Sequence, residues 1–247
     1  MEIKTIENLK MWIKGYVESA HSKGVVVGMS GGKDSLVVAK LCADAIGKKN
    51  VFGIIMPNGE MIDKSDAERT CELLGINYTI LDIGAGYNSI LQNAKKALGG
   101  LELSDVTTIN TAPRVRMTTL YAIAGTLNYL VANTSNLSEA SVGYTTKWGD
   151  NIGDFAPLAN FTKTEVCEIG LMLGLPNELV NKDPSDGLSG KSDEDKLGFG
   201  YAELDDYIRN GIKGDKFELI CKKHRTSEHK RVGAVKFEYK KKNYFVE

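Results

Sequence analysis

Hydrophobic positions along the chain follow two alternating periods, one typical of helices and one typical of strands. Ile6, Leu9, Ile13 and Val17 recur at helical spacing and predict an opening surface helix. Short apolar runs typical of strands follow, at residues 25–27, 51–56, 78–81 and 129–132, with a further short one at 155–158. Most of the runs are bounded by glycine or polar residues, which separates them from the helical segments.

Helical periodicity fills the segments between these runs. Residues 63–74 form one amphipathic pattern that ends at Gly75, and residues 113 to about 128 form another. Alternating strands and helices predict an α/β fold: a doubly wound, Rossmann-like parallel sheet of about five strands with helices on both faces. In such sheets, ligands bind beyond the carboxyl ends of the strands.

Length and charge restrict the classes of protein. The 247 residues suit a single α/β domain over 1–247, and 31 basic against 32 acidic residues argue against a protein that coats nucleic acid. The segment from about 222 to 247 is locally basic. Residues 183–200 are polar and rich in glycine, so we expect a mobile loop there, either a lid or a linker.

Cysteine usage and hydropathy indicate where the protein is located. The four cysteines, Cys42, Cys71, Cys167 and Cys221, are far apart and form no Cys-x-x-Cys pair, so neither disulfides nor a zinc site is indicated. No signal peptide and no apolar stretch of membrane-spanning length is visible. We therefore expect a cytoplasmic protein without a membrane partner.

The first strand is followed by the glycine-rich turn Gly-Met-Ser-Gly-Gly-Lys-Asp-Ser, residues 28–35, and then by a helical pattern. Glycines let backbone N–H groups approach an anion, and the helix N-terminus adds a favourable dipole. Ser30 and Ser35 offer further hydrogen bonds. Asp34 implies Mg²⁺, since a carboxylate beside phosphate oxygens needs a bridging divalent cation. The turn predicts a metal–nucleotide site.

Two better-known phosphate loops do not match this turn. A Walker A loop places the lysine next to Ser or Thr, whereas Lys33 precedes Asp34. The glycine spacing also differs from the Gly-x-Gly-x-x-Gly dinucleotide fingerprint. The remaining pattern, Ser-Gly-Gly-x-Asp-Ser, resembles the signature of the ATP pyrophosphatases, which split ATP between its α and β phosphates.

Further polar side chains follow the predicted strands. Thr134 and Glu139 come after the run at 129–132, so they belong to the same sheet edge as the glycine turn. Glu139 therefore supplies a second carboxylate for the Mg²⁺ expected at Asp34. The other polar candidates in this part of the chain are Arg114, Arg116, Lys147, Asp150, Asp154 and Lys163.

Six motifs together resemble the ammonia-dependent branch of the NAD⁺ synthetases, and the likeness extends from about residue 3 to residue 236. They are the segments 110–117, 134–139, 146–150, 161–163, 182–186 and 228–231, which come in addition to the glycine turn. In that family the nicotinate carboxylate of deamido-NAD⁺ attacks the α-phosphorus of ATP. Pyrophosphate leaves, and ammonia converts the acyl-adenylate to the amide.

The resemblance implies a role for each matching residue. Asp34, Lys163 and Asp150 match catalytic positions, with Asp150 as the group that takes a proton from ammonium, and Asp34 and Glu139 match the Mg²⁺ ligands. The implied ATP contacts are Gly28, Met29, Ser30, Gly31, Gly32, Lys33, Asp34, Ser35, Thr134, Lys163 and Ser185. The implied deamido-NAD⁺ contacts are Arg114, Lys147, Asp154, His229 and Lys230.

The chain departs from the family pattern at a few positions. Pro113 replaces a common alanine and suits the first turn of a helix. Met56 stands where the family often has an arginine near the adenine. Family members are homodimers, and the apolar residues of 117–127 fit either a dimer contact or burial against the sheet.

Alternative functions remain open. Other ATP pyrophosphatases that modify tRNA or transfer sulfur share the glycine turn. Those that thiolate tRNA are expected to carry paired cysteines, which this sequence lacks. A non-catalytic module that binds ATP or AMP has no use for Asp34, Glu139 and Lys163 together. No amidase segment precedes the first helix, so we expect the use of ammonia, with a separate glutaminase partner left open.

Overall fold

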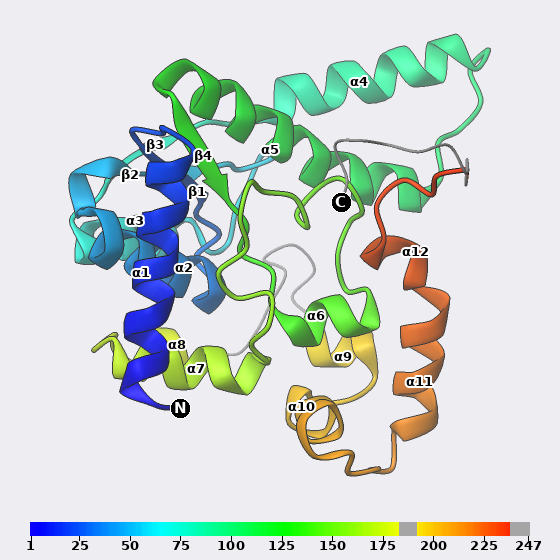
Figure 1. Ribbon diagram of the computed structural model, residues 1–247. Helices are drawn as coiled ribbons and strands as arrows, with labels where there is room; N and C mark the ends of the chain where they lie inside the picture. Colours follow the sequence, from blue (N-terminus) through cyan, green and yellow to red (C-terminus); the bar gives the residue numbers. More distant parts are fainter. Residues whose placement is uncertain (183–191, 238–247) are drawn as a thin grey trace.

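A four-stranded parallel sheet forms the centre of the computed structural model, which describes residues 1–182 and 192–237. The strands are β1 (Gly24–Gly28), β2 (Val51–Ile55), β3 (Asn77–Ile80) and β4 (Tyr129–Ala132), in the order β3-β2-β1-β4 (Figure 1). Val25 of β1 lies opposite both Val51 of β2 and Leu130 of β4. The chain adds β2 and β3 on one side of β1 and then crosses to add β4 on the other side. This change in strand order is the doubly wound topology that the sequence predicts.

The expectation of about five strands is wrong by one strand in the described residues. Phe155 makes a single parallel bridge to Ala132, and the backbone N–H of Asn133 donates to the carbonyl of Phe155 at 2.9 Å. The chain then turns at Pro157, which has no N–H to donate to a sheet. The ladder therefore stops after one bridge.

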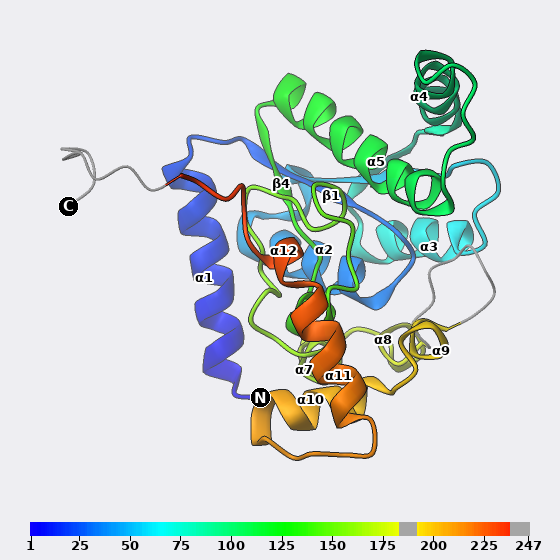
Figure 2. The ribbon, with the colours of Figure 1, turned by 90° about the vertical axis from the view of Figure 1, so that its right-hand side faces the viewer.

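Helices cover both faces of the sheet. Val25 and Val27 of β1 face a core built with α1 (Ile3–Ser19), α2 (Lys33–Ile46), α3 (Lys64–Leu74), α7 (Lys163–Met172) and α8 (Asn177–Val180). Val26 points to the opposite face, where α5 (Asp105–Leu127) packs, because successive side chains of a strand alternate. Figure 2 shows α5 on the opposite side of the sheet from α1 and α2. A short 3-10 turn, Lys48–Asn50, leads into β2.

The helix predicted from Pro113 begins much earlier. Ser104 caps it by accepting the backbone N–H of Thr107 at 3.3 Å, and Pro113 lies inside the helix rather than in its first turn. The predicted role of Pro113 is therefore wrong. A strong serine cap outweighs the local preference of one proline, and tertiary packing of α5 holds the helix together across it. Helix α4 (Gly84–Ala97), which precedes α5, was not predicted.

The apolar half of α5 packs against the sheet. Ala124 is buried, and Leu120, Tyr121 and Ile123 pack on the cluster that contains Val26. Burial of residues 117–127 against the sheet is therefore confirmed, and the dimer contact stays a prediction.

A second group of helices lies beyond the carboxyl end of the sheet. It contains α6 (Leu137–Val142), α9 (Asp193–Leu197), α10 (Tyr201–Asn210), α11 (Phe217–Thr226) and α12 (Glu228–Arg231) (Figure 1). The predicted mobile loop lies outside the described residues at 183–191, and its remainder forms α9, where Leu197 is buried. The basic tail is helical up to Arg231, and residues 238–247 lie outside the description.

Asp205 joins this helical group to the helices that carry the candidate site. Its carboxylate accepts hydrogen bonds from the hydroxyl of Ser138 and, at 2.8 and 2.7 Å, from the backbone N–H and hydroxyl of Thr164. Ser138 in turn accepts the backbone N–H of Lys163 at 2.9 Å. The first turns of α6 and α7 are thereby fixed against α10. Across the described ranges, no helix combines the length and apolar character needed to cross a membrane.

Candidate active site

The glycine turn passes directly from the carboxyl end of β1 into α2. Gly31 has a φ of +80°, and a Cβ there would lie 2.5 Å from the carbonyl oxygen of Asp63. Only glycine fits this position. Gly32 precedes the first helical residue and supplies no side-chain cap. The first N–H groups of this 14-residue helix therefore have no capping side chain, as anion sites at helix N-termini require.

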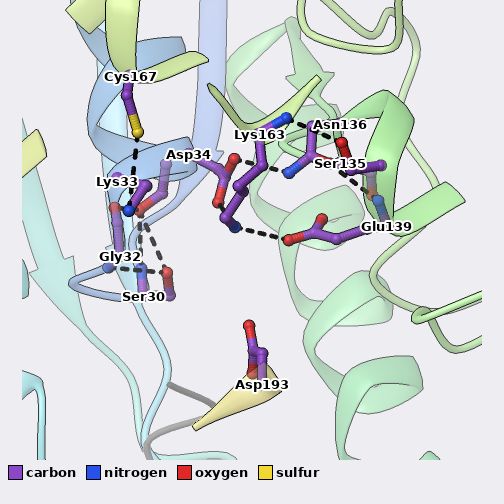
Figure 3. A network of polar contacts seen from close by, with 12 residues as sticks. Ser30, Gly32, Lys33, Asp34, Ser135, Asn136, Glu139, Lys163, Cys167 and Asp193 are labelled. Atoms are coloured by element: carbon purple, nitrogen blue, oxygen red, sulfur yellow. Dashed lines mark hydrogen bonds and ion pairs between the residues drawn. The ribbon is translucent and has the colours of Figure 1, made fainter. Parts of the chain in front are cut away.

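The side chains of the turn stabilise its backbone. Ser30 and Ser35 lie 3.2 Å apart between their hydroxyl oxygens, and Ser35 donates to the carbonyl of Gly32 at 2.9 Å. The backbone N–H of Gly32 donates to the Ser30 hydroxyl. Lys33 is buried and directs its ammonium to Cys167 Sγ of α7 at 3.7 Å (Figure 3). The hydroxyls and Lys33 thus hold the loop in shape.

A buried ion-pair network lies beside this turn. The Lys163 ammonium is 2.6 Å from Asp34 Oδ2 and 2.8 Å from Glu139 Oε1 (Figure 3). Asn136 donates its side-chain N–H to Asp34 Oδ1 at 2.9 Å. The Lys163 side chain is only 6% exposed, whereas those of Asp34 and Glu139 keep 17% and 16%, so the network opens to solvent on the carboxylate side.

Helix caps bring these three charges together. Asn136 caps α6 by accepting the backbone N–H of Glu139 at 3.0 Å, and Thr162 caps α7 in a capping box with Glu165. Glu139 and Lys163 therefore both stand in the first turn of a helix. Asp34 stands in the first turn of α2. Three helix N-termini thus converge on one small volume.

Burial and charge pairing set the protonation states of the network. Burial by itself lowers the pKa of the Lys163 ammonium, but Asp34 and Glu139 raise it well above its ordinary value. Burial raises the pKa of Glu139 to about 7, and Lys163 offsets only part of that effect. The ammonium stays charged, and Glu139 takes up a proton near neutral pH.

The donor set fits a hard divalent cation. Asp34 and Glu139 bring their carboxylates together around the Lys163 ammonium, and oxygen is the ligand atom that Mg²⁺ prefers. Within residues 1–182 and 192–237, no three His, Cys, Asp or Glu side chains form a ready cluster. Mg²⁺ is usually held by one or two carboxylates together with substrate phosphates and water, so two carboxylates are sufficient.

A cavity opens at the carboxyl ends of β1, β2 and β4, on the other side of the glycine turn. Its lining combines apolar side chains with polar ones, and the polar ones include Thr134 and Asp150. The main apolar lining residues are Met29, Met56, Met61, Met117 and Leu120. Arg116 also lines the cavity and donates its Nε–H to the carbonyl of Met56 at 3.0 Å. Methionine side chains adapt to flat apolar rings, which favours a nucleobase here.

Asp150 is an exposed residue whose carboxylate is held by a backbone contact. Its Oδ1 accepts the backbone N–H of Thr146 at 2.6 Å. Partial desolvation of the carboxylate raises the pKa of Asp150, although the Thr146 hydrogen bond and the charge of Lys230 oppose this. Asn133 donates to the backbone carbonyl of Asp150 at 3.0 Å and fixes the loop. Asp150 is therefore a positioned carboxylate at the cavity wall.

Four of the five residues predicted to contact the dinucleotide lie together. Arg114 donates its Nε–H to the carbonyl of Lys147 at 3.2 Å, and the Lys147 ammonium reaches the carbonyl of His229 at 2.5 Å. Lys230 donates to two carbonyls, those of Gly143 and Thr145, at 2.7 Å each. The C-terminal helix α12 is thus attached to the loop that carries Lys147.

The structure does not bring Asp154 into this group. Its carboxylate accepts the backbone N–H of Val131 at 2.7 Å and the hydroxyl of Tyr121 at 3.2 Å, which places it beside β4. Ser185, predicted to contact ATP, lies outside the described residues.

Several residues of the site were not assigned from the sequence. Asn136 was quoted only as part of a motif, although its capping position next to Glu139 was a usable signal. Arg116 was noted as polar but given no role. Asp193 is buried close to the ion-pair network, as Figure 3 shows, and nothing local in the sequence indicated this. Its position depends on the packing of α9.

Comparison with known proteins identifies relatives along nearly the whole chain. The family model described as NAD synthase matches residues 5–244. The NH(3)-dependent NAD(+) synthetase of Finegoldia magna is 42% identical, with 98% of each chain covered. That of Thermococcus sibiricus is 44% identical, covering 96% of this chain and 89% of the relative.

Solved structures show the same fold. NMN synthetase from Francisella tularensis superimposes with a TM-score of 0.88 at 33% identity, covering 96% of this chain and 98% of that one. NH3-dependent NAD synthetase from Campylobacter jejuni, in complex with the nitrate ion, gives a TM-score of 0.76 at 29% identity, covering 96% and 100%.

The ion-pair network predicts a pH-dependent loss of stability when its cation is removed. We expect Lys163→Met to lower the free energy of unfolding by about 3 kcal/mol at pH 8, because two buried carboxylates lose their partner. Without the ammonium, the pKa of Glu139 rises further above its ordinary 4.5. The loss in free energy of unfolding relative to wild type is therefore small below about pH 6 and grows as the pH rises through 7 to 9. Denaturant unfolding across this range measures it.

Lys182→Met is the matched control. Lys182 also lies 2.5 Å from two carboxylates, those of Asp63 and Asp66, but its side chain is 29% exposed. Solvent screening limits its expected loss to less than about 1 kcal/mol. An equal loss for Lys163→Met at pH 6 and pH 9 would contradict the proposed charge pairing.

Proposed function

The chain belongs to the NAD synthase family, and we propose how its own residues carry out the reaction of that family. The protein is a ligase that forms a C–N bond: it amidates deamido-NAD⁺ with ammonia at the expense of ATP. The nicotinate carboxylate is adenylated, pyrophosphate leaves, and ammonia displaces AMP. A reaction of this kind needs a group that accepts pyrophosphate and a separate group that accepts a proton from ammonium.

The observation that carries the proposal is the position of the Lys163 network between three helix N-termini. The open N–H groups at the start of α2 are suited to the β and γ phosphates of ATP. Lys163 adds a fixed positive charge on the same side as Asp34 and Glu139. Mg²⁺ bound to these two carboxylates would spread the charge of the leaving pyrophosphate.

The cavity next to the turn is suited to the adenosine half of ATP. Met29 and Met56 lie on its floor, and the carbonyl of Met56 is held by Arg116. An adenine ring on this floor leaves the α-phosphate near the glycine turn, within the part of the cavity that Asp150 lines.

Asp150 is our candidate for the proton acceptor. Only NH₃ has the lone pair that attacks the acyl-adenylate, so a carboxylate beside the acyl carbon can bind ammonium and take its proton. Partial desolvation of its carboxylate raises the pKa of Asp150, which makes it a stronger base than a fully solvated aspartate. The cations Arg114, Lys147 and Lys230, together with the neighbouring His229, form the group that we assign to deamido-NAD⁺.

A single incubation tests the function. We expect the protein with Mg-ATP, deamido-NAD⁺ and ammonium to form NAD⁺ and AMP in equal amounts, with glutamine a poor substitute for ammonium. Nucleotide products are separated by chromatography. Formation of ADP instead of AMP would mean that a different bond of ATP is broken, and efficient glutamine use by the pure protein would refute direct dependence on ammonia.

Asp34→Asn tests the metal assignment in the same assay. The change removes one carboxylate and keeps its shape, so we expect the fold to persist while AMP formation falls by about 100-fold or more. Circular dichroism checks the fold. Near-normal pyrophosphate release by this variant would contradict the role of Asp34 as a Mg²⁺ ligand.

A mononucleotide substrate is the second candidate. The superposition on an NMN synthetase has a TM-score of 0.88, against 0.76 for the NAD synthetase from Campylobacter jejuni. Nicotinate mononucleotide carries the same reacting carboxylate and lacks the adenylate half of deamido-NAD⁺. Comparing kcat/KM for nicotinate mononucleotide and deamido-NAD⁺ decides between the two substrates. We expect the protein to prefer deamido-NAD⁺, because its curated relatives are NAD(+) synthetases.

We also propose that the protein is a cytoplasmic homodimer that associates through α4 and the start of α5. Helix α4 has no buried residue, and the start of α5 exposes Val106 by 68% and Ile109 by 66%. Figures 1 and 2 show α4 standing away from the rest of the fold beside α5. Leu98 and Leu101 next to it are also more than half exposed. A second copy covering this apolar surface accounts for it.

Charge on this surface should abolish the dimer. We expect a wild-type mass near twice 26.9 kDa, and monomers for Val106→Asp combined with Ile109→Asp. Ile212→Asp, at a 55% exposed position between α10 and α11, is the control that stays dimeric. Sedimentation velocity measures the mass. A monomeric wild type would refute the dimer, and an unchanged double variant would refute the surface.

A further inference from the structure

Tyr201 lies next to Lys163 of the ion-pair network, and the proposed function gives it no role. It is the first residue of α10, is 4% exposed, and donates its backbone N–H to Glu194 Oε1 at 2.8 Å. The Lys163 ammonium lies 5.2 Å from the centre of its ring. This is a cation–π contact in a buried setting, so the ring helps to hold Lys163 in place.

The hydroxyl of Tyr201 is the unusual feature. In the described part of the chain it is the only buried side-chain oxygen or nitrogen without a hydrogen-bond partner. Buried polar groups in folded proteins are nearly always paired, because an unpaired one loses its hydration without compensation. An unpaired hydroxyl at the edge of a candidate site therefore indicates a ligand that pairs with it.

The surroundings define the chemistry of that ligand. Glu139, Lys163, Asp193 and Asp34 all influence the hydroxyl electrostatically. Burial, followed by the charge of Glu139, raises the pKa of Tyr201, so the hydroxyl stays protonated and can donate. The carboxylate of Asp34 is already paired with Lys163 and Asn136, and that of Asp193 accepts the hydroxyl of Tyr144 at 3.0 Å. The Tyr201 hydroxyl therefore has no acceptor among the described residues.

We propose that the Tyr201 hydroxyl donates a hydrogen bond to an oxygen of the pyrophosphate group bound with its divalent cation beside Asp34, Glu139 and Lys163. A phosphate oxygen is an anionic acceptor, whereas water bound to the cation would present hydrogens. Tyr201 thus combines two functions: its ring supports Lys163, and its hydroxyl binds the group that leaves. This inference rests on the proposed function.

Tyr201→Phe isolates the hydroxyl, since the ring and its contact with Lys163 remain. Because the hydroxyl has no partner in the protein itself, we expect the ligand-free variant to be at least as thermally stable as wild type. Its Kd for Mg²⁺ with inorganic pyrophosphate should rise about tenfold or more, the effect of losing a hydrogen bond to a charged acceptor. Binding of Mg²⁺ alone should not change.

Calorimetric titration and thermal melts give these values without turnover. Tyr207→Phe is the control on the same helix, and its ring packs on Phe217, away from the network. In steady-state assays, Tyr201→Phe should lower kcat/KM for ATP and leave KM for deamido-NAD⁺ unchanged.

The possible failures are distinct. Wild-type affinity for Mg²⁺-pyrophosphate in Tyr201→Phe would overturn the inference while leaving the proposed function intact. A lower melting temperature of the ligand-free variant, with unchanged ligand binding, would show a purely structural role and overturn it too. Weaker binding of Mg²⁺ alone, by the same factor, would assign the hydroxyl to the cation instead. Absence of Mg²⁺-pyrophosphate binding by wild type would overturn the proposed function itself.

Discussion

The contact between Lys163 and the two carboxylates is the interaction on which the rest of the site depends. Asp34, Glu139 and Lys163 come from the first turns of α2, α6 and α7, three helices far apart in the chain. A buried ion pair contributes little net stability, and its loss is costly because it leaves charges without partners. Its value here is therefore geometric: it holds the carboxylates of Asp34 and Glu139 together around one ammonium.

The outer helices maintain that geometry. Asp205 of α10 binds the starts of α6 and α7 through Ser138 and Thr164. At the other end of α6, the Arg231 guanidinium donates to the carbonyl of Ser141 at 3.1 Å, and Lys230 donates to Gly143. Cations at a helix C-terminus are favourable, since the last carbonyls have no partner in the helix. Both ends of the short helix that carries Glu139 are thus fixed.

Two different surfaces meet at the glycine turn and divide the chemistry between them. On one side, buried charges favour phosphate and a divalent cation; on the other, methionine side chains favour a flat ring. The nucleoside triphosphate that we propose as the ligand has one part suited to each surface. The change in strand order at β1, where the chain adds β2 and β3 on one side and β4 on the other, produces this arrangement, because ligands bind at such a switch point.

The sequence by itself determined the elements with strong local signals: the four strands, the helix that ends at Gly75, and the glycine turn, in which only glycine fits at Gly31. It also indicated Asp34, Glu139 and Lys163 as chemically linked. Only the tertiary structure decided the start of α5 ahead of Pro113, the single bridge at Phe155, the separate position of Asp154 and the burial of Tyr201. These depend on contacts between distant segments, and local periodicity carries no information about such contacts.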